Sequence, residues 1–172
     1  KFRPDFQLIK QIYGIGIPSI IMASIGSVMT FTMNKILISF TTTATAVFGS
    51  YFKLQSFIFM PIFGLNNGMV PIIAYNYGAK RYDRVKKTIT LSIVSAMTIM
   101  IIGFSAFELI PDVLLSFFNA SKEMLEIGVP ALRIIGTHLL LAGFCIISGS
   151  VCQAIGKPVY SLIVSVCRQL VV

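Results

Sequence analysis

The feature that most limits how this chain can fold is a long run without charge that ends in a dense basic cluster. No residue from Leu54 to Ala79 is charged. As a helix, at about 1.5 Å per residue, the run is long enough to cross a bilayer core of about 30 Å. The cluster that follows has a single acid, Asp83, among five basic residues: Lys80, Arg81, Arg84, Lys86 and Lys87. Because basic residues beside a span stay in the cytoplasm, the stretch predicts both a span and its orientation.

The same pattern recurs along all 172 residues, of which 56% are hydrophobic and 12% charged. Soluble domains have about 25% charged residues. Charge-free runs predict spans at about residues 11–34, 50–75, 88–107 and 128–156, and the start of an incomplete fifth span at 159–172. In lipid each span has to satisfy its backbone polar groups within its own helix. The predicted fold is therefore an all-α membrane protein, a polytopic helix bundle.

The charges between the runs predict the topology. With the basic loop at residues 78–87 in the cytoplasm, alternation places Lys10 and Lys157 inside and the connection at 108–122 outside. A short apolar piece in that connection, residues 113–118, is too short to span and is expected at the membrane interface. Ser121 is expected to begin the next helix. We expect a multi-pass protein of the cell (plasma) membrane. The net charge of +8 is explained by this topology and does not indicate a nucleic-acid partner.

Aromatic and amide side chains form a stripe on the second predicted span. Steps of four, four, three and four place on one helix face Tyr51, Gln55, Phe59, Ile62 and Asn66. Asn66 and Asn67 lie near the expected midplane of the bilayer, where polar groups face a neighbouring helix or a watery cavity. One interpretation is a cavity for an amphipathic organic ligand, and the alternative is hydrogen bonding between helices.

The first predicted span carries methionines at similar spacing, including Met22 and Met29. Thioether side chains repack around different shapes, which would suit a loosely selective cavity, although such a stripe also fits a plain core. Pro18, Pro61 and Pro71 lie within spans and predict bends. The pair Gly64 and Gly68 predicts close packing of the second span against a neighbour.

Three further side chains have alternative interpretations. His138 is the single imidazole of the chain and is a candidate proton relay, with hydrogen-bonded packing as the alternative. Lys53 is expected to anchor the outer end of its span by reaching the interface. Arg133, at the outer end of the fourth span, is expected to reach the interface or to pair with a nearby acid.

The chain has six carboxylates, and all lie in loops or at the ends of predicted helices. It contains no catalytic triad pattern, paired catalytic acids, metalloprotease motif or phosphate loop. The cysteines Cys145, Cys152 and Cys167 lie in apolar runs without a histidine at metal spacing. We therefore expect no enzyme, no metal site and no cofactor.

Several motifs resemble the MATE (multidrug and toxic compound extrusion) family. They are Pro18-Ser19, Phe52-Lys-Leu-Gln-Ser-Phe57, Phe63-Gly-Leu-Asn-Asn-Gly68, Pro71-Ile-Ile, Tyr75-Asn-Tyr-Gly-Ala-Lys80 with Arg84, Gln153-Ala-Ile-Gly156-Lys-Pro158 and Arg168-Gln169. The resemblance covers nearly the whole chain and places it in the second half of such a transporter, from the linker before the seventh helix into the eleventh. The chain opens without an initiator Met and stops within an apolar run, and we expect it to be a piece of a longer protein.

The resemblance implies one lobe of a two-lobe secondary transporter with alternating access. Such a protein would export cationic or amphipathic organic compounds in exchange for Na⁺ or H⁺, and its partners would be these compounds, the bilayer and a missing N-terminal lobe. Some branches of the family have membrane-embedded acids in this half, and the matching spans here have none. Any coupling acid would then lie in the first half. Two alternatives remain: a lipid-linked saccharide flippase of the wider superfamily, and a membrane scaffold that transports nothing.

Overall fold

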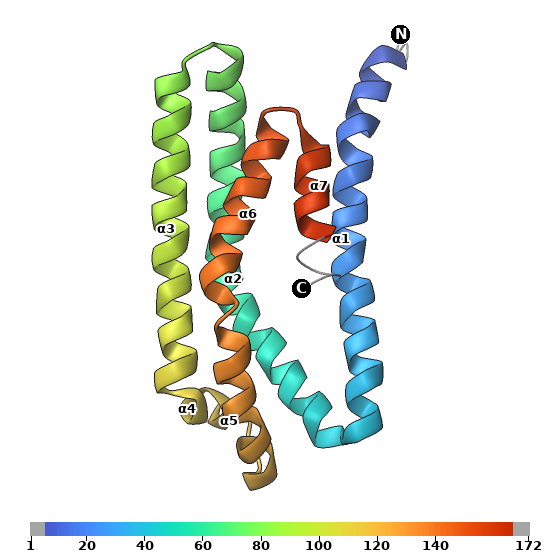
Figure 1. Ribbon diagram of the computed structural model, residues 1–172, viewed down its shortest axis with the longest axis vertical. Coiled ribbons are helices and arrows are strands. Elements are labelled where there is room, and N and C mark those ends of the chain that lie inside the picture. Colours follow the sequence, from blue (N-terminus) through green and yellow to red (C-terminus); the bar gives the residue numbers. More distant parts are fainter. Residues whose placement is uncertain (1–5, 167–172) are drawn as a thin grey trace.

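The computed structural model describes residues 6–166, apart from the side chain of Ile15. This part of the chain forms seven helices and no strand, which confirms the all-α prediction. The helices are α1 (Phe6–Phe40), α2 (Thr42–Gly78), α3 (Tyr82–Leu109), α4 (Pro111–Ser116), α5 (Lys122–Gly136), α6 (Leu139–Ala154) and α7 (Pro158–Val166). Figure 1 shows an elongated bundle in which the long helices run roughly side by side.

Three of the described helices are individually long and apolar enough to cross a membrane. These are α1, α2 and α3, with 35, 37 and 28 residues, and α5 with α6 makes a fourth if the pair is one span. Each of the three is longer at both ends than the predicted spans at 11–34, 50–75 and 88–107. Polar residues that flank an apolar run can also be helical. A helix can therefore extend beyond the residue at which hydrophobicity falls. Of the predicted fifth span, residues 167–172 lie outside the described part.

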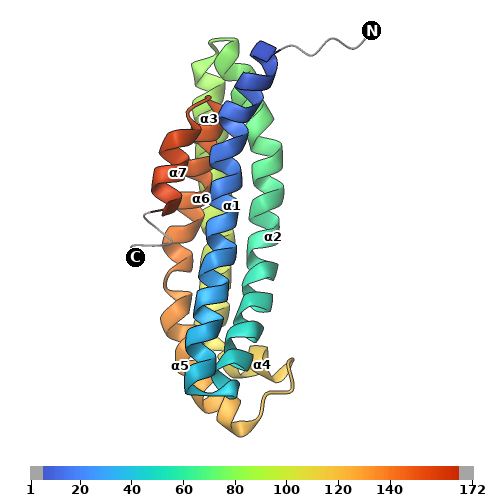
Figure 2. The same ribbon diagram turned by 90° about the vertical axis from the view of Figure 1, so that its right-hand side faces the viewer.

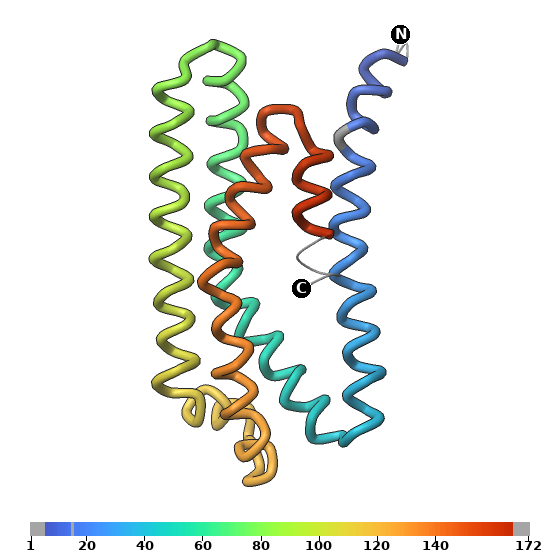
Figure 3. The backbone as a smooth tube through the Cα atoms, viewed as in Figure 1, coloured from blue at the N-terminus to red at the C-terminus, as the bar shows by residue number. Residues whose placement is uncertain are grey.

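Proline lies inside two of the long helices, Pro18 in α1 and Pro61 and Pro71 in α2. Proline lacks a backbone donor and its ring collides with the carbonyl one turn earlier, so it commonly bends a helix. Figure 3 shows that α2 changes direction part-way along its length. The N-terminal half of α2 thereby leans toward α1, and its C-terminal half runs along α3 (Figures 1 and 3).

The predicted fourth span is broken in the structure. Instead of one helix over 128–156, α5 and α6 meet at an angle of 45°. At the junction Thr137 Oγ1 donates a hydrogen bond to the Ile134 carbonyl at 2.7 Å, and His138 Nδ1 lies against the Ile135 carbonyl. The His138 amide also bonds to Ile135, a tighter turn than that of an α-helix. Side chains that bind nearby carbonyls compete with the helical ladder, and this explains the break.

The end of the bundle away from the turn between α2 and α3 is closed by α4 and the start of α5 (Figure 1). The six residues of α4 correspond to the apolar piece expected not to span. Ser121 begins α5 as predicted, because its side chain accepts a hydrogen bond from the Met124 amide. Arg133 Nε lies 3.5 Å from Glu108 Oε2, which confirms the expected pairing with a nearby acid. Lys53 Nζ lies 5.6 Å from the centre of the Phe118 ring, so this cation is held at the same end of the bundle.

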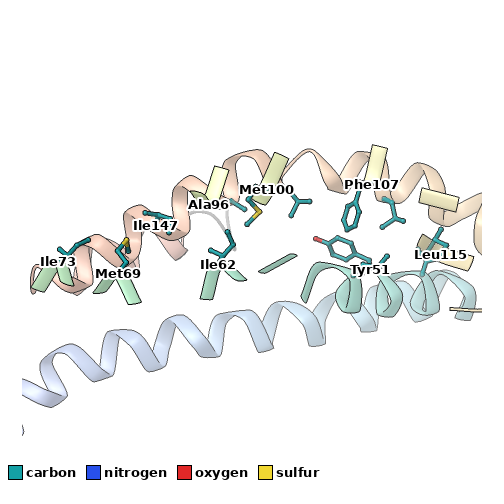
Figure 4. Packing of buried hydrophobic residues seen from close by; sticks show 14 of the residues in the cluster. Tyr51, Ile62, Met69, Ile73, Ala96, Met100, Phe107, Leu115 and Ile147 are labelled. Atoms are coloured by element: carbon teal, nitrogen blue, oxygen red, sulfur yellow. The ribbon is translucent and has the colours of Figure 1, made fainter. Parts of the chain in front are cut away.

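The buried core lies between α2 and the helices α3, α5 and α6 (Figure 4). Its fully buried side chains include Ile62, Ile73, Met100, Phe107, Leu132, Leu139 and Ile147. No buried core residue of the described part comes from α1. This helix contacts α7 and also reaches α2, which follows it after the turn at Thr41, and Figures 1 and 2 show it as the outermost long helix on its side. A space therefore lies between α1 and the core.

Close packing of helices depends on glycines other than those expected. A Cβ atom at Gly143 would lie 2.8 Å from Met100 Cγ, and one at Gly103 would lie 2.8 Å from the Ile58 side chain. At Gly64 and Gly68, in contrast, a Cβ atom would meet nothing within 4 Å in the described part. The predicted close contact at this pair is therefore absent from this lobe, because that face of α2 has no neighbour here.

Candidate functional site

A cavity of about 1060 Å³ lies between α1, the N-terminal half of α2 and the junction of α5 with α6. No Asp, Glu, Lys or Arg is among its lining residues, which are Ala23, Gly26, Ser27, Met29, Thr30, Phe31, Met33, Asn34, Phe48, Tyr51, Phe52, Gln55, Phe59, Ile135, His138 and Ala142. The volume is at the upper end of the range for small-molecule sites, which is about 300–1,000 Å³. A drug-sized ligand fits into such a space.

One wall of the cavity comes from α2. Its lining residues recur every three or four positions, so they share a helix face, and this face includes the predicted Tyr51, Gln55 and Phe59. Phe48 and Phe52 add an edge-to-face ring pair with centres 4.7 Å apart. Tyr51 itself is buried and points its ring toward Phe107 in the core (Figure 4), with centres 6.2 Å apart. Packing of Tyr51 against the core thus fixes the position of this wall.

The opposite wall comes from α1, which contributes Met29 and Met33. Met22 lies outside the lining. Its sulfur is 3.6 Å from Ser161 Oγ and 4.0 Å from Gln153 Nε2, and the two polar groups are themselves hydrogen-bonded at 3.2 Å. Met22 therefore ties α1 to α6 and α7, in accordance with the alternative of plain packing, while Met29 faces the cavity.

Asn66 and Asn67 also lie outside the lining. Asn67 is exposed, and the Asn66 side-chain oxygen is buried without a hydrogen-bond partner among the described residues. Ile62, the member of the predicted stripe between Phe59 and Asn66, is fully buried in the core. The stripe therefore divides at this point, where α2 contains Pro61. A role of the two asparagines in ligand binding stays a prediction.

The polar centre of the cavity is formed by Gln55 and His138. Their Nε2 atoms lie 3.5 Å apart. His138 Nδ1 lies against the Ile135 carbonyl, which can only accept, so we assign the ring proton to Nδ1. In the neutral ring Nε2 is then an acceptor, and the Gln55 amide donates to it. The Tyr51 ring stands edge-on to the imidazole with centres 6.4 Å apart. The predicted relay residue and one predicted cavity residue are thus brought together by the helix break.

Sequence reasoning missed the polar residues of α1 that line the cavity: Ser27, Thr30 and Asn34. They follow one another at steps of three and four within a charge-free run. This periodicity was a usable signal, because polar groups repeated on one face of a span indicate a helix neighbour or a cavity. Two further lining residues were not predicted: Phe48 precedes the predicted second span, and Phe52 lies between Tyr51 and Gln55 without belonging to their stripe.

Acids are not part of the site, and His138 is the single side chain of a metal-ligand type in its lining. The carboxylates of the described residues, Asp83, Glu108, Asp112, Glu123 and Glu126, lie at helix ends or within the first turns of helices. Within residues 6–166 no three His, Cys, Asp or Glu side chains come close enough together to hold a metal ion. A ligand in this cavity therefore meets rings, thioethers, hydroxyls and amides.

Comparison with known proteins identifies relatives that share sequence and fold. Multidrug export protein MepA of Staphylococcus aureus (strain MSSA476) is 29% identical over 155 residues, covering 90% of this chain and 34% of its own length. The protein of the same name from Staphylococcus haemolyticus is 27% identical over 170 residues, or 37% of its length. The fold matches an outward-facing multidrug resistance MATE family transporter of the MOP superfamily with a TM-score of 0.88, at 24% identity over 99% of this chain and 39% of that one.

The chain thus spans about a third of the length of the curated relatives it matches, as expected for one lobe of a two-lobe protein. The two relatives are export proteins by name and the solved structure is a transporter by name, in agreement with the expectation that the chain is not an enzyme. The MatE family model matches residues 18–172, nearly all of the chain. The resemblance read from the sequence motifs is therefore confirmed, and this multi-pass membrane chain belongs to the MatE family.

Proposed function

We propose that the protein containing this lobe exports cationic or amphipathic organic compounds across the plasma membrane by ion-coupled antiport with alternating access. The observation that carries the proposal is the cavity of about 1060 Å³, which has a chemically mixed lining but no fixed charge. Membership of the MatE family and the export function in the names of its relatives support it.

The lining suits flat or bulky ligands of varied shape. Rings such as those of Phe52 and Phe59 attract organic cations without a fixed ion pair, and Met29 can adapt to ligand shape. Gln55, turned toward the polar centre, can orient a ligand by hydrogen bonding. Attraction by rings alone is weak, which suits a transporter, because the ligand has to leave again.

We further propose that His138 couples ligand binding to proton movement. A second proton on the ring would sit on Nε2 and convert it from an acceptor to a donor. Gln55 would then have to turn its amide and offer the oxygen in place of the nitrogen. Apart from His138, Tyr51 is the single titratable group in the lining, so no neighbouring charge compensates this change. Protonation therefore rearranges the polar centre and competes with a cationic ligand. A carboxylate in the first lobe would be a separate coupling group for Na⁺ or H⁺.

The flippase alternative is not favoured by this site. A lipid-linked saccharide carries phosphate, and its cavity would need basic side chains, which the lining lacks. A scaffold without transport would have no use for a cavity of this size beside a bend in a helix pair.

Ethidium counterflow with the full-length protein in proteoliposomes tests the transport proposal. Vesicles preloaded with unlabelled ethidium should accumulate labelled ethidium well above protein-free vesicles. An imposed pH gradient should drive the same uptake if the coupling ion is H⁺, and a Na⁺ gradient should drive it if the ion is Na⁺. Absence of counterflow from protein that elutes as a folded, monodisperse species would overturn the proposal.

Orientation is tested separately by cysteine labelling in cells, after Cys145, Cys152 and Cys167 are replaced by serine. A Lys80→Cys variant, in the turn between α2 and α3, should react with a membrane-impermeant maleimide only after the cells are opened. A Lys122→Cys variant, at the start of α5, should react in intact cells. The reverse pattern would show that the predicted topology is wrong.

A further inference from the structure

The basic residues between α2 and α3 form a surface cluster whose charge has no partner. Lys80, Arg81, Arg84, Lys86 and Lys87 are all exposed, and Asp83 is the single acid among them. Within the described part none of these five side chains makes an ion pair or lies over a ring. We call these five residues the inner basic cluster. Its positive charge is open to an external ligand.

Several other cations of the described chain are held by a neighbour. Lys35 lies over Phe31 at 5.5 Å, Lys53 over Phe118 at 5.6 Å and Lys157 over Tyr160 at 6.0 Å. Arg133 lies beside Glu108. Orientation of the chain in the membrane needs positive charge at the inner end, but it does not need a hollow beside that charge.

Such a hollow lies next to the inner basic cluster on the outward face of α3. It has a volume of about 340 Å³ and is lined by Asp83, Lys86, Lys87, Thr90 and Leu91. These residues are three and four positions apart, so they descend along one side of the helix. From the helix start the order is charged groups, then a hydroxyl, then an apolar side chain.

The same side of α3 continues as an apolar surface. Leu91 is 57% exposed and Val94 is 58% exposed, and Ile101 follows two turns further on. Figure 1 shows that α3 stands at the edge of the bundle opposite α1. Its core-facing side carries the buried Ala96, Met100 and Phe107 instead. The polar-to-apolar order of the outward face is that of a phospholipid: phosphate, glycerol ester, acyl chain.

Aromatic residues mark the same level of the membrane. Tyr77 and Tyr82 lie edge to face across the turn between α2 and α3, with ring centres 6.0 Å apart, and Tyr75 is 77% exposed. Tyrosine is enriched where headgroups meet acyl chains. The hollow is therefore at the depth where a lipid phosphate lies.

We propose that Lys86, Lys87 and Thr90 bind the headgroup of an anionic phospholipid, with one acyl chain along Leu91 and Val94. An anionic lipid is favoured over a zwitterionic one because the cluster has no acid beyond Asp83 to receive a headgroup cation. Clusters of four to eight basic residues beside a membrane helix are typical of such recognition. The proposed topology assigns the lipid to the inner leaflet, and only this leaflet assignment rests on the proposed function.

Native mass spectrometry of the purified full-length protein tests this site without any transport assay. The probes are phosphatidylglycerol and phosphatidylcholine with identical acyl chains, added one at a time in detergent. We expect phosphatidylglycerol to bind in preference, and the double variant Lys86→Gln/Lys87→Gln to weaken that binding about 30-fold, the effect of two lysines near an anionic surface. Lys122→Gln removes one exposed cation at the opposite end of the bundle and should leave binding unchanged.

Two further arms identify the occupant. Leu91→Asn should weaken phosphatidylglycerol binding while leaving all cations in place, because it disturbs the acyl-chain path. Free glycerol 3-phosphate in excess should not displace the lipid. The proposal is overturned if phosphatidylcholine binds equally well or if the double lysine variant binds as the wild type does. Displacement by glycerol 3-phosphate, with Leu91→Asn unaffected, would instead assign the cluster to a soluble phosphate compound.

Discussion

Replacement of Gln55 by alanine should reduce ethidium export about tenfold. The variant removes the amide that faces His138 Nε2 at 3.5 Å and leaves the imidazole without its partner in the cavity. Loss of one partner of a polar pair costs about 1–3 kcal/mol, and about 1.4 kcal/mol corresponds to a tenfold change in rate or affinity. The measurement is the efflux rate of ethidium from cells that express the full-length protein, normalised to the amount of protein in the membrane.

Two matched variants make this result specific to the cavity. Ser56→Ala changes the next residue, which does not line the cavity and whose hydroxyl donates to the Phe52 carbonyl of the same helix. This variant should export ethidium as the wild type does. Asn67→Ala tests the hypothesis that the asparagines near the bilayer midplane bind the ligand. Because Asn67 lies outside the cavity lining, we expect this variant to have little effect on export. If Asn67→Ala abolishes export while Gln55→Ala does not, the ligand path lies along the other part of α2.

A double variant tests whether Gln55 and His138 act as a pair. His138→Ala should reduce export as Gln55→Ala does, and the combination should be hardly worse than either alone, since both remove the same interaction. Additive losses would mean that the two residues act independently, and the proposed proton coupling through their contact would be wrong.

The helical fold of this chain could be predicted from the sequence because few backbone conformations other than a helix are stable in lipid. A charge-free run in a bilayer has to be helical, so runs such as 88–107 correspond closely to helices such as α3. The break between α5 and α6 was not accessible in this way. It depends on which carbonyl the side chains of Thr137 and His138 bind, a local choice that hydropathy does not record.

Residues of the site could be predicted only where periodicity in the sequence placed them on one face of a helix over a few turns. Periodicity placed Tyr51, Gln55 and Phe59 together, and they do share one wall of the cavity. The same periodicity did not show that Ile62 turns into the core or that Met22 meets Ser161. A repeat identifies which residues face the same way, but the neighbour they face is decided by helices distant in sequence. His138 and Gln55, far apart in the chain, are such a case.

Glycine contacts illustrate the same limit and lead to the largest expected effect on stability. Gly143→Val should destabilise the folded lobe by about 2–3 kcal/mol, the upper part of the usual range for overpacking. At this position α6 crosses α3 so closely that a Cβ atom would lie 2.8 Å from Met100 Cγ and 3.5 Å from the Ala96 carbonyl oxygen. Met100 is fully buried, and the atoms that the new Cβ would meet are its Cγ and Cβ, which lie close to the backbone and not at the flexible end of the side chain. Close backbone contact through small residues is a main source of helix association in lipid, so separation of α3 from α6 weakens the whole core.

The matched control for this variant is Gly64→Val, which introduces the same side chain into another long helix. A Cβ atom at Gly64 meets nothing within 4 Å in the described part, so we expect its effect on this lobe to be small. Both variants of the full-length protein are heated in steps and the remaining folded fraction is measured by size-exclusion chromatography. Gly143→Val should lose its folded peak at a clearly lower temperature than Gly64→Val. The opposite order would mean that Gly64 packs closely against a part of the transporter beyond this lobe, and that the pair Gly64 and Gly68, and not the contact of α6 with α3, limits stability.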